Sequence, residues 1–597
     1  MDRILDSKRI DLLPSSPLHF PSLYYKPTTI AAYLVWAHRC FFYFTGKDRV
    51  LLMMPKKTLS AAILCSLCAF PAWAGAAAQT ANSQTAAPAV SAQAAPAASS
   101  QSQASYDLTF PAAKGVKESL SLDNRQVTYY AYRDLVYVAH PKNADYEKMN
   151  IFIPAAYLEG KSVNGYTAQT APIFLPNQVG GYMPGKAGDP KDTHVMGGGS
   201  TSTLLQALDR GYVVASPAIR GRSTTDANGT YVGKAPALIV DYKAAVRYLR
   251  HNRKQLPAGD TEKIISNGTS AGGALSALLG ATGNSPDYEP YLREIGAAEE
   301  RDDIFGSMDY CPITDLPHAD LAYEWVFNGV NTAHQSFAMQ APSQGGASFP
   351  GNGAAPAAGT VADRPANAPR ETAQGTPMTS AQKKVSSQLK ALFPAYVNSL
   401  GLKDAEGRLL TLDKNGSGSF KEYIKGIYMA SAQKALDGGA DLSKLDWLTI
   451  KDGKVKDMDL AKYAAFATRL KAAPAFDKLD GSSGENDEFA TSTNQPRHFS
   501  TFGYEHRTDK NPMAPAEDIK LLSPLEYIGK ESVTLAPHWR IRHGSVDRDT
   551  AMPVPAMLAL KLQEQGKDVD FAAAWGKGHA GDYDLDELFA WIDSICK

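Results

Sequence analysis

The chain has 597 residues, and its 61 lysine and arginine residues nearly balance 62 aspartate and glutamate residues, for a formal net charge of −1. This balance excludes the basic surface that nucleic-acid-binding proteins require. Hydrophobic residues make up 44% of the chain, and five cysteines are too few for a disulfide-based scaffold of this length. The composition leaves a large globular enzyme or binding protein.

Residues 53–74 have the pattern of a secretory signal peptide, with a basic start, an apolar stretch over Leu59–Phe70 and a small-x-small site at Ala72–Ala74. We therefore expect translation to begin at Met53 or Met54, which makes 1–52 an upstream extension outside the natural protein. The alternative is a membrane anchor over 28–46, but that stretch contains a histidine and an arginine near its middle. The signal predicts a periplasmic or secreted protein without stable membrane association after cleavage.

Two low-complexity segments flank or interrupt the rest of the chain. Residues 75–105 are nearly all Ala, Gln, Ser, Thr and Pro, and this composition predicts a disordered linker. The tract 341–379 is rich in Gly, Ala and Pro and is expected to be a surface loop or part of a lid. Export leaves Cys311 and Cys596, which could pair or remain as two buried thiols.

Short apolar runs alternate with helical patterns from residue 106 onward, which predicts an α/β fold with a mostly parallel sheet and helices on both faces. The pattern holds over 106–315, breaks over 316–524 and resumes over 525–597, so we expect one α/β core split by an inserted lid domain. The predicted strands are 126–140, 148–154, 171–175, 212–216, 263–266, 539–543 and 569–575, with the first two at the sheet edge. The predicted helices are 237–252, 274–280, 553–565 and 585–595.

The motif Gly268-x-Ser270-x-Gly272 lies between a predicted strand and a helix of small residues. Such a turn exposes a serine hydroxyl, and the start of the following helix offers free N–H groups to a developing oxyanion. The context favours a nucleophilic serine over an ordinary glycine-rich turn.

The expected partners of Ser270 follow in the order acid, then histidine. His579 lies in a glycine-rich loop after the last predicted strand, and Asp547 lies in the loop after the strand before it. Asp547 would hold one ring nitrogen of His579 and stabilise its charged form. Three other acids compete for this role, namely Asp549, Asp582 and Asp584, and His543 is a less favoured base.

The oxyanion hole needs two backbone donors. The N–H of Ala271 is one candidate, and Gly180 or Gly181, in a loop after an early strand, supplies the other. The glycines 197–199 are an alternative for the second donor.

No metal or cofactor is predicted. Asp413–Phe420 copies the first half of a calcium loop, but Ile424 occupies the position of the closing glutamate, so a helix-capping turn is favoured. No zinc-ligand spacing occurs, which favours metal-independent hydrolysis.

The motifs Gly-Thr-Ser-Ala-Gly-Gly at 268–273 and Arg-His-Gly-Ser-Val-Asp-Arg-Asp-Thr at 542–550 resemble those of bacterial tannases, the tannin acyl hydrolases of the α/β-hydrolase superfamily. The resemblance extends from about residue 106 to the C-terminus, outside the low-complexity tracts. It implies the triad Ser270, Asp547 and His579, the same three residues that the motif order indicates.

The resemblance further implies that Lys471, Glu485 and Asp549 bind the three vicinal phenol groups of gallate. Glu488, only three residues after Glu485, competes with it for this assignment. Without the resemblance, these charges would be read as ordinary surface residues. The implied activity is hydrolysis of galloyl esters, small-molecule substrates, by a serine esterase through an acyl-enzyme. The alternatives are a feruloyl or general carboxylesterase on the same scaffold, a serine peptidase, and a binding protein without turnover.

Overall fold

The structure is a computed structural model that describes residues 105–192, 202–334 and 375–597. The predicted upstream extension, the signal peptide and almost all of the 75–105 linker lie outside the described residues, as do glycines 197–199 and most of the 341–379 tract. Within the described ranges, no helix has the length and apolar character needed to cross a bilayer.

A nine-stranded sheet forms the centre of the fold, in the order β1-β2-β3-β5-β4-β6-β7-β12-β13. Its strands are β1 (Val116–Leu122), β2 (Arg125–Val136), β3 (Lys148–Pro154), β4 (Pro172–Pro176), β5 (Val213–Pro217), β6 (Asp260–Thr269), β7 (Gly306–Tyr310), β12 (His538–Gly544) and β13 (Asp568–Ala574). Every neighbouring pair from β5 to β13 is parallel, whereas β1, β2, β3 and β5 pair in antiparallel fashion. The prediction of a mostly parallel α/β sheet is confirmed.

The edge of the sheet differs from the prediction, which placed β2 and β3 there. β3 pairs on both sides, and the edge strand is β1, whose residues are mostly exposed. Its sequence, Val-Lys-Glu-Ser-Leu-Ser-Leu, lacks the apolar run typical of a buried strand, which is why the pattern was missed. The short central strand β7 was also missed, although all five of its residues are buried.

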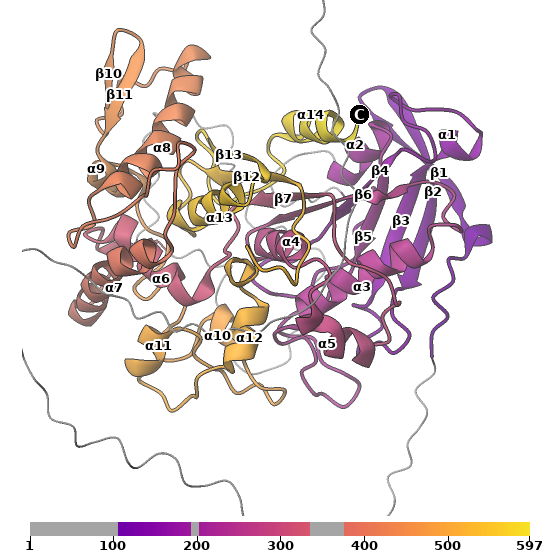
Figure 1. The fold of residues 1–597 in the computed structure, drawn as a ribbon, viewed down its shortest axis with the longest axis horizontal. Helices are drawn as coiled ribbons and strands as arrows, with labels where there is room; N and C mark the ends of the chain where they lie inside the picture. Colours follow the sequence, from indigo (N-terminus) through magenta and orange to yellow (C-terminus); the bar gives the residue numbers. More distant parts are fainter. Residues whose placement is uncertain (1–104, 193–201, 335–374) are drawn as a thin grey trace, which may run out of the picture. The chain divides into compact units, whose positions relative to one another are not determined.

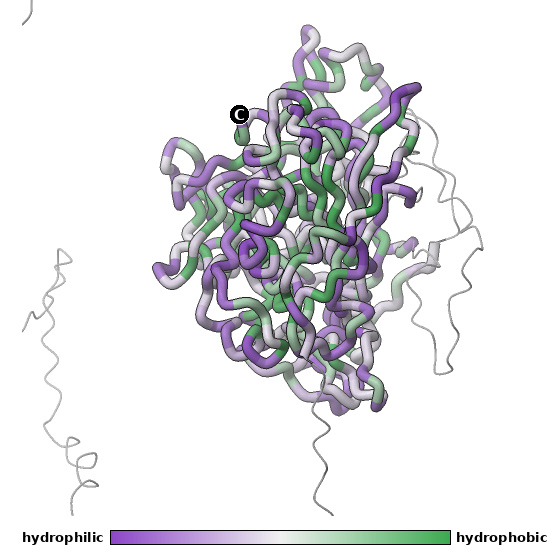
Figure 2. The backbone as a smooth tube through the Cα atoms, turned by 90° about the vertical axis from the view of Figure 1, so that its right-hand side faces the viewer, coloured by the Kyte–Doolittle hydropathy of each residue, from purple (hydrophilic) through white to green (hydrophobic). Residues whose placement is uncertain are grey.

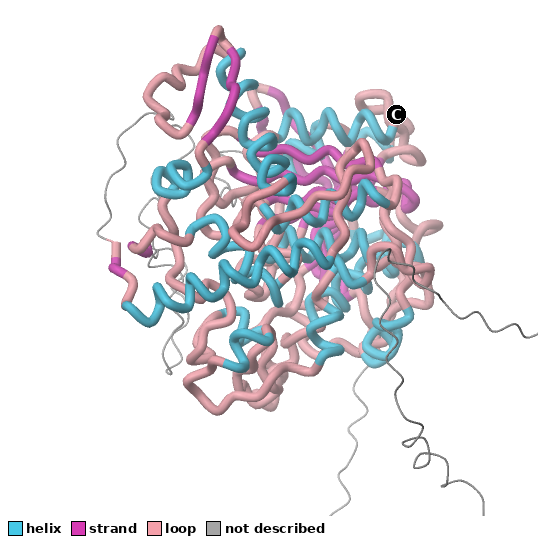
Figure 3. Tube along the Cα trace, turned by 60° about the vertical axis from the view of Figure 1, so that its left-hand side comes forward, coloured by secondary structure: helices cyan, strands magenta, loops and turns pink. Residues whose placement is uncertain are grey.

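The helices of the core pack against this sheet or, like α5, against a helix that does (Figures 1 and 3). They are α1 (Ala155–Leu158), α2 (Thr203–Asp209), α3 (Ala237–His251), α4 (Ala271–Ala281), α5 (Glu289–Glu294), α13 (Pro553–Glu564) and α14 (Leu585–Cys596), with short 3₁₀ turns η1 (Ala112–Lys114), η2 (Pro286–Tyr288) and η5 (Pro524–Glu526). The parallel strands β4, β5 and β7 are buried along their whole length, as expected when helices cover both faces. Figure 2 shows the hydrophobic residues concentrated in this interior.

The chain between β7 and β12 leaves the sheet, because these two strands are direct neighbours and pair in parallel. Its elements are α6 (Leu316–Phe327), β8 (Thr332–Ala333), β9 (Thr376–Pro377), α7 (Ser380–Ser399), α8 (Ser419–Asp437), β10 (Leu448–Lys451), β11 (Lys454–Met458), α9 (Leu460–Ala467), α10 (Gly484–Glu488), α11 (Thr501–Glu505) and α12 (Ala516–Leu521). In Figure 1 the elements α7–α9 and the β10–β11 hairpin lie beyond the β13 side of the sheet, and α10–α12 lie below it.

The four neighbouring parallel strands β6, β7, β12 and β13 bring their carboxyl ends to one edge of the sheet. In open α/β sheets, ligand sites form at this edge. The residues that follow these strands include Ser270, Cys311, Asp547 and His579.

Candidate active site

Ser270 occupies a strained turn between β6 and α4. Its backbone dihedrals are φ 62° and ψ −121°, outside the ordinary regions for an L-residue, and such a conformation costs about 1–3 kcal/mol. Its N–H donates to the Tyr310 carbonyl at 2.9 Å, which fastens the turn to β7. The side chain is thereby presented at the start of α4, whose first N–H groups have no acceptor within the helix.

The glycines of the motif are required by close packing. A Cβ on Gly268 would lie 2.1 Å from the Gly272 carbonyl oxygen, and one on Gly272 would lie 2.5 Å from the Val179 carbonyl oxygen. The second contact brings the Gly180–Gly181 loop against the serine turn. The two predicted sources of oxyanion-hole donors are therefore adjacent.

His579 is held by Asp547. The Nδ1 atom of His579 lies 2.8 Å from Asp547 Oδ2, and Asp547 also accepts the backbone N–H groups of Asp549 and Thr550. Burial, the largest single influence, would raise the pKa of Asp547, but the charges of His579 and His543 and the hydrogen bonds to the carboxylate together outweigh it, and the net shift is downward. Conversely, burial alone would lower the pKa of His579, but Asp547 and then Asp549 outweigh it and raise that pKa well above its usual value.

The competing acids have other partners. Asp582 accepts hydrogen bonds from Thr203 and Asn267, and Asp584 pairs with Arg540 at 2.6 Å. His543 is fully buried, and its Nδ1 atom is 3.8 Å from Asp547 Oδ2, too far for a hydrogen bond.

A cavity of about 420 Å³ opens beside Ser270 and His579. Eight of the nine predicted site residues line it, namely Gly180, Gly181, Ser270, Ala271, Lys471, Glu485, Asp549 and His579. The ninth, Asp547, lies behind His579. Glu488 is not among the lining residues; it is fully buried and its carboxylate oxygens have no hydrogen-bond partner in the described part of the chain.

The polar end of the cavity is built around an ion pair. Lys471 Nζ lies 2.8 Å from Asp549 Oδ1 and 4.1 Å from the centre of the Phe476 ring. Burial alone would lower the pKa of Lys471, but the charges of Asp549 and Glu485 outweigh it and raise that pKa. Lys471 therefore stays charged inside the cavity, between two carboxylates.

Known proteins resemble this chain in sequence and in structure. The family model BD-FAE matches residues 180–342, and no match is found among curated proteins. The tannin acyl hydrolase of Lactobacillus plantarum is 43% identical, with a TM-score of 0.74, over 82% of this chain and 99% of that chain. The tannase of Fusobacterium nucleatum is 45% identical, with a TM-score of 0.74, over 82% of this chain and 100% of that chain.

A further solved structure, a tannin acyl hydrolase in complex with ethyl gallate, is 43% identical, with a TM-score of 0.73, over 82% of this chain and 99% of that chain. The chain belongs to the tannase family. It is thus a carboxylic ester hydrolase of the α/β-hydrolase fold, and the resemblance seen in the motifs is confirmed.

The cavity of this tannase-family chain depends on contacts made by α6. The Tyr323 hydroxyl donates to the Arg548 carbonyl at 2.7 Å and accepts the N–H of Lys471 at 3.2 Å. One phenol therefore fixes both the segment that carries Lys471 and the loop that carries Asp549.

The next buried layer is an ion pair between Glu324 and Arg469, both fully buried. The Arg469 guanidinium makes a two-pronged contact with the carboxylate, and its Nε donates to the Lys471 carbonyl at 2.6 Å. This pair joins α6 to the Lys471 segment.

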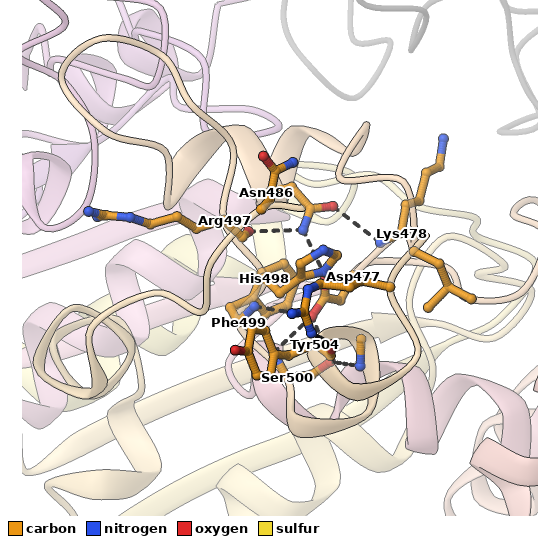
Figure 4. Close-up of polar contacts among 12 residues, drawn as sticks. Asp477, Lys478, Asn486, Arg497, His498, Phe499, Ser500 and Tyr504 are labelled. Atoms are coloured by element: carbon orange, nitrogen blue, oxygen red, sulfur yellow. Dashed lines mark hydrogen bonds and ion pairs between the residues drawn. The ribbon is translucent and has the colours of Figure 1, made fainter. Parts of the chain in front are cut away.

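A second polar cluster, centred on Asp477, holds α10, the helix that carries Glu485 (Figure 4). The Asp477 carboxylate accepts the amide of Asn486, the Nδ1–H of His498, and the N–H and hydroxyl of Ser500. Asn486 belongs to a capping box at the start of α10. A buried carboxylate with this many donors is a rigid support.

Several residues around the tannase-family cavity were not predicted. Tyr182, Ile313, Phe476 and Thr550 line it, and Cys311 lies beside His579. Their residue types carry no signal of function. Only the neighbouring motifs could have drawn attention to Tyr182, next to Gly181, and to Thr550, next to Asp549.

Proposed function

We propose that the chain hydrolyses galloyl esters to gallate and an alcohol through an acyl-enzyme on Ser270. This proposal rests on one observation: Ser270, held in a strained turn, lines the same cavity as His579 and the charged residues Lys471, Asp549 and Glu485. Membership of the tannase family supports the same conclusion.

In this mechanism Ser270 attacks the ester carbonyl while His579 accepts its proton, and Asp547 stabilises the imidazolium that forms. The N–H of Ala271 and one N–H of the Gly180–Gly181 loop hold the oxyanion. His579 then protonates the departing alcohol. A water molecule, deprotonated by His579, attacks the galloyl-enzyme and releases gallate and free Ser270.

Recognition of the galloyl ring is assigned to Lys471, Glu485 and Asp549. Carboxylates accept hydrogen bonds from phenolic hydroxyls, and an ammonium donates to a phenol oxygen. Because these groups are partly or fully buried, an unhydroxylated benzoyl ester would leave them without partners. The related structures solved with ethyl gallate and with 3,4-dihydroxybenzoate support this choice of substrate.

The test compares wild type with Ser270→Ala and Asp549→Ala on methyl gallate, methyl benzoate and methyl ferulate. We expect Ser270→Ala to lose at least about 10⁴-fold in kcat/KM and to lose labelling by a fluorophosphonate probe. We expect Asp549→Ala to reduce the preference for gallate over benzoate by about 10- to 100-fold, since a lost hydrogen bond to a charged group is worth ~1.5–3 kcal/mol. Equal wild-type rates on the three esters would contradict the galloyl assignment.

We further propose export to the periplasm or medium by the segment 53–74. N-terminal sequencing of the exported protein is expected to begin at or near Gly75. A mature protein that retains residues 1–52 would contradict this.

A further inference from the structure

Cys311, His543 and Asp547 form a buried cluster behind His579. All three are at most 1% exposed, and one potential ligand atom from each lies within 4.8 Å of the other two. The proposed mechanism uses only Asp547. Cys311 is a free thiol, and neither ring nitrogen of His543 has a hydrogen-bond partner among the described residues.

The parallel sheet creates this cluster. β7 and β12 are neighbours, and Tyr310 of β7 is paired with Arg542 of β12. The residues that follow these two, Cys311 and His543, therefore lie side by side. The Cys311 N–H donates to the Arg542 carbonyl at 2.7 Å, which locks the two positions together. A buried histidine whose ring nitrogens have no hydrogen-bond partner is energetically unfavourable, and a further group that binds one of these nitrogens would remove the penalty.

We propose that this cluster is an inhibitory site for a soft divalent cation such as Zn²⁺ or Cd²⁺. Thiolate, imidazole and carboxylate are the ligands that such ions take, and zinc bonds of about 2.0–2.3 Å give ligand-to-ligand separations of roughly 3.3–3.8 Å, which lengthen for the larger Cd²⁺. His543 Nδ1 and Asp547 Oδ2 are already 3.8 Å apart, and the remaining separations are within 4.8 Å. Small side-chain rotations would complete three of the four tetrahedral positions.

The charges of the assembly also balance. A thiolate and a carboxylate supply two negative charges to the divalent ion, so a neutral unit is buried, which avoids the penalty of an unpaired charge. Binding breaks the S–H bond of Cys311, forms a metal–sulfur bond and releases one proton to solvent, with no change of oxidation state.

The substrate cavity provides the route of entry. His579 and Ala580 line that cavity, and the Cys311 sulfur contacts the Ala580 carbonyl at 3.5 Å. An ion bound to Asp547 Oδ2 would compete with His579, because His579 Nδ1 contacts the same oxygen. Occupancy would therefore remove the support of His579 and stop turnover.

The test is a Cd²⁺ titration of the full chain in which Cys40, Cys65 and Cys68 are replaced by serine. Bound cadmium is counted after desalting, the ultraviolet absorption of the cadmium–thiolate bond is followed, and initial rates on methyl gallate are measured. We expect one ion per chain, binding and inhibition with the same midpoint, and recovery of activity with EDTA. The absorption reports binding even if the ester is not a substrate.

Three variants locate the ion. Cys311→Ala and His543→Leu should each raise the cadmium concentration needed for half-saturation by at least about tenfold. Cys596→Ser, the other described thiol, should leave it unchanged. Unchanged binding in His543→Leu would reduce the site to a lone thiol and overturn the proposal, as would loss of binding in Cys596→Ser. If a variant fails to fold, the cadmium NMR chemical shift is measured on the chain that carries only the three serine replacements. The proposal requires a shift typical of one sulfur ligand together with nitrogen and oxygen ligands. A shift typical of any other ligand set contradicts the site.

Discussion

At the scale of single residues, the Asp549 carboxylate lies close to two other ionisable side chains. It pairs with Lys471 in the cavity, and its Oδ1 lies 4.0 Å from His579 Nε2. The same carboxylate therefore belongs to the proposed galloyl-binding group and contributes to the charge around the proposed base.

This arrangement predicts a shift in the pH profile of Asp549→Asn. His579 must be neutral to accept the serine proton, so kcat/KM rises with pH through the pKa of His579. Because Asp547 and Asp549 together outweigh burial and raise that pKa, removing the charge of Asp549 should lower it. The acid limb of kcat/KM should move to lower pH.

Glu485→Gln is the matched control for that experiment. Glu485 also lines the cavity, but it is not among the charges that shift the pKa of His579. Its variant should bind substrate less well with the acid limb in the wild-type position. An acid limb that stays in place or moves to higher pH in Asp549→Asn would contradict the assignment.

At the scale of elements, Arg222 joins the Gly180–Gly181 loop to α10. Its Nε donates to the Gly181 carbonyl at 3.0 Å, and its Nη1 contacts Asp487 at 2.5 Å. Its own N–H donates to the Tyr182 carbonyl at 2.8 Å. One side chain thus links the loop proposed to offer an oxyanion donor to the helix that carries Glu485.

We expect Arg222→Ala to lower kcat for every ester, by about tenfold or more, because the loop donor loses its position. Lys234→Met is the informative comparison, since Lys234 also contacts Asp487, at 2.6 Å, but makes no hydrogen bond to Gly181. That variant should raise KM for gallate esters and leave kcat nearly unchanged. The same kcat in Arg222→Ala and wild type would show that the loop is held by other contacts.

At the scale of the whole molecule, a buried ion pair joins two distant parts of the insertion between β7 and β12. Glu324 and Arg469 are both fully buried and lie 145 residues apart in the chain. Breaking such a pair leaves an uncompensated charge, whereas replacing both partners by apolar residues is far less costly.

Glu324→Gln should therefore lower the free energy of unfolding by about 3–5 kcal/mol, while the double variant Glu324→Leu with Arg469→Met should lose less. Urea denaturation measures both. Glu564→Gln, which breaks the exposed pair with Lys403, should change stability by no more than about 1 kcal/mol. A double variant less stable than Glu324→Gln would show that the pair is net stabilising.

Much of the chemistry could be read from local sequence. The serine turn needs glycines at 268 and 272 for steric reasons that any chain would obey, and the α/β alternation follows from apolar periodicity. The order Ser270, Asp547, His579 could be predicted because each residue follows a strand. The strands β1 and β7 could not, since one is too polar and the other too short to give a periodic signal.

Tertiary structure alone decided which charges meet. Lys471, Glu485 and Asp549 lie in three separate segments, and only packing against α6 and around Asp477 brings them to one cavity. Strand pairing likewise placed Cys311 and His543 side by side, although more than two hundred residues separate them in the sequence. Local sequence determines which backbone turns and elements form, because those depend on near neighbours. Long-range pairing determines the electrostatic environment, because it depends on which segments exclude water together.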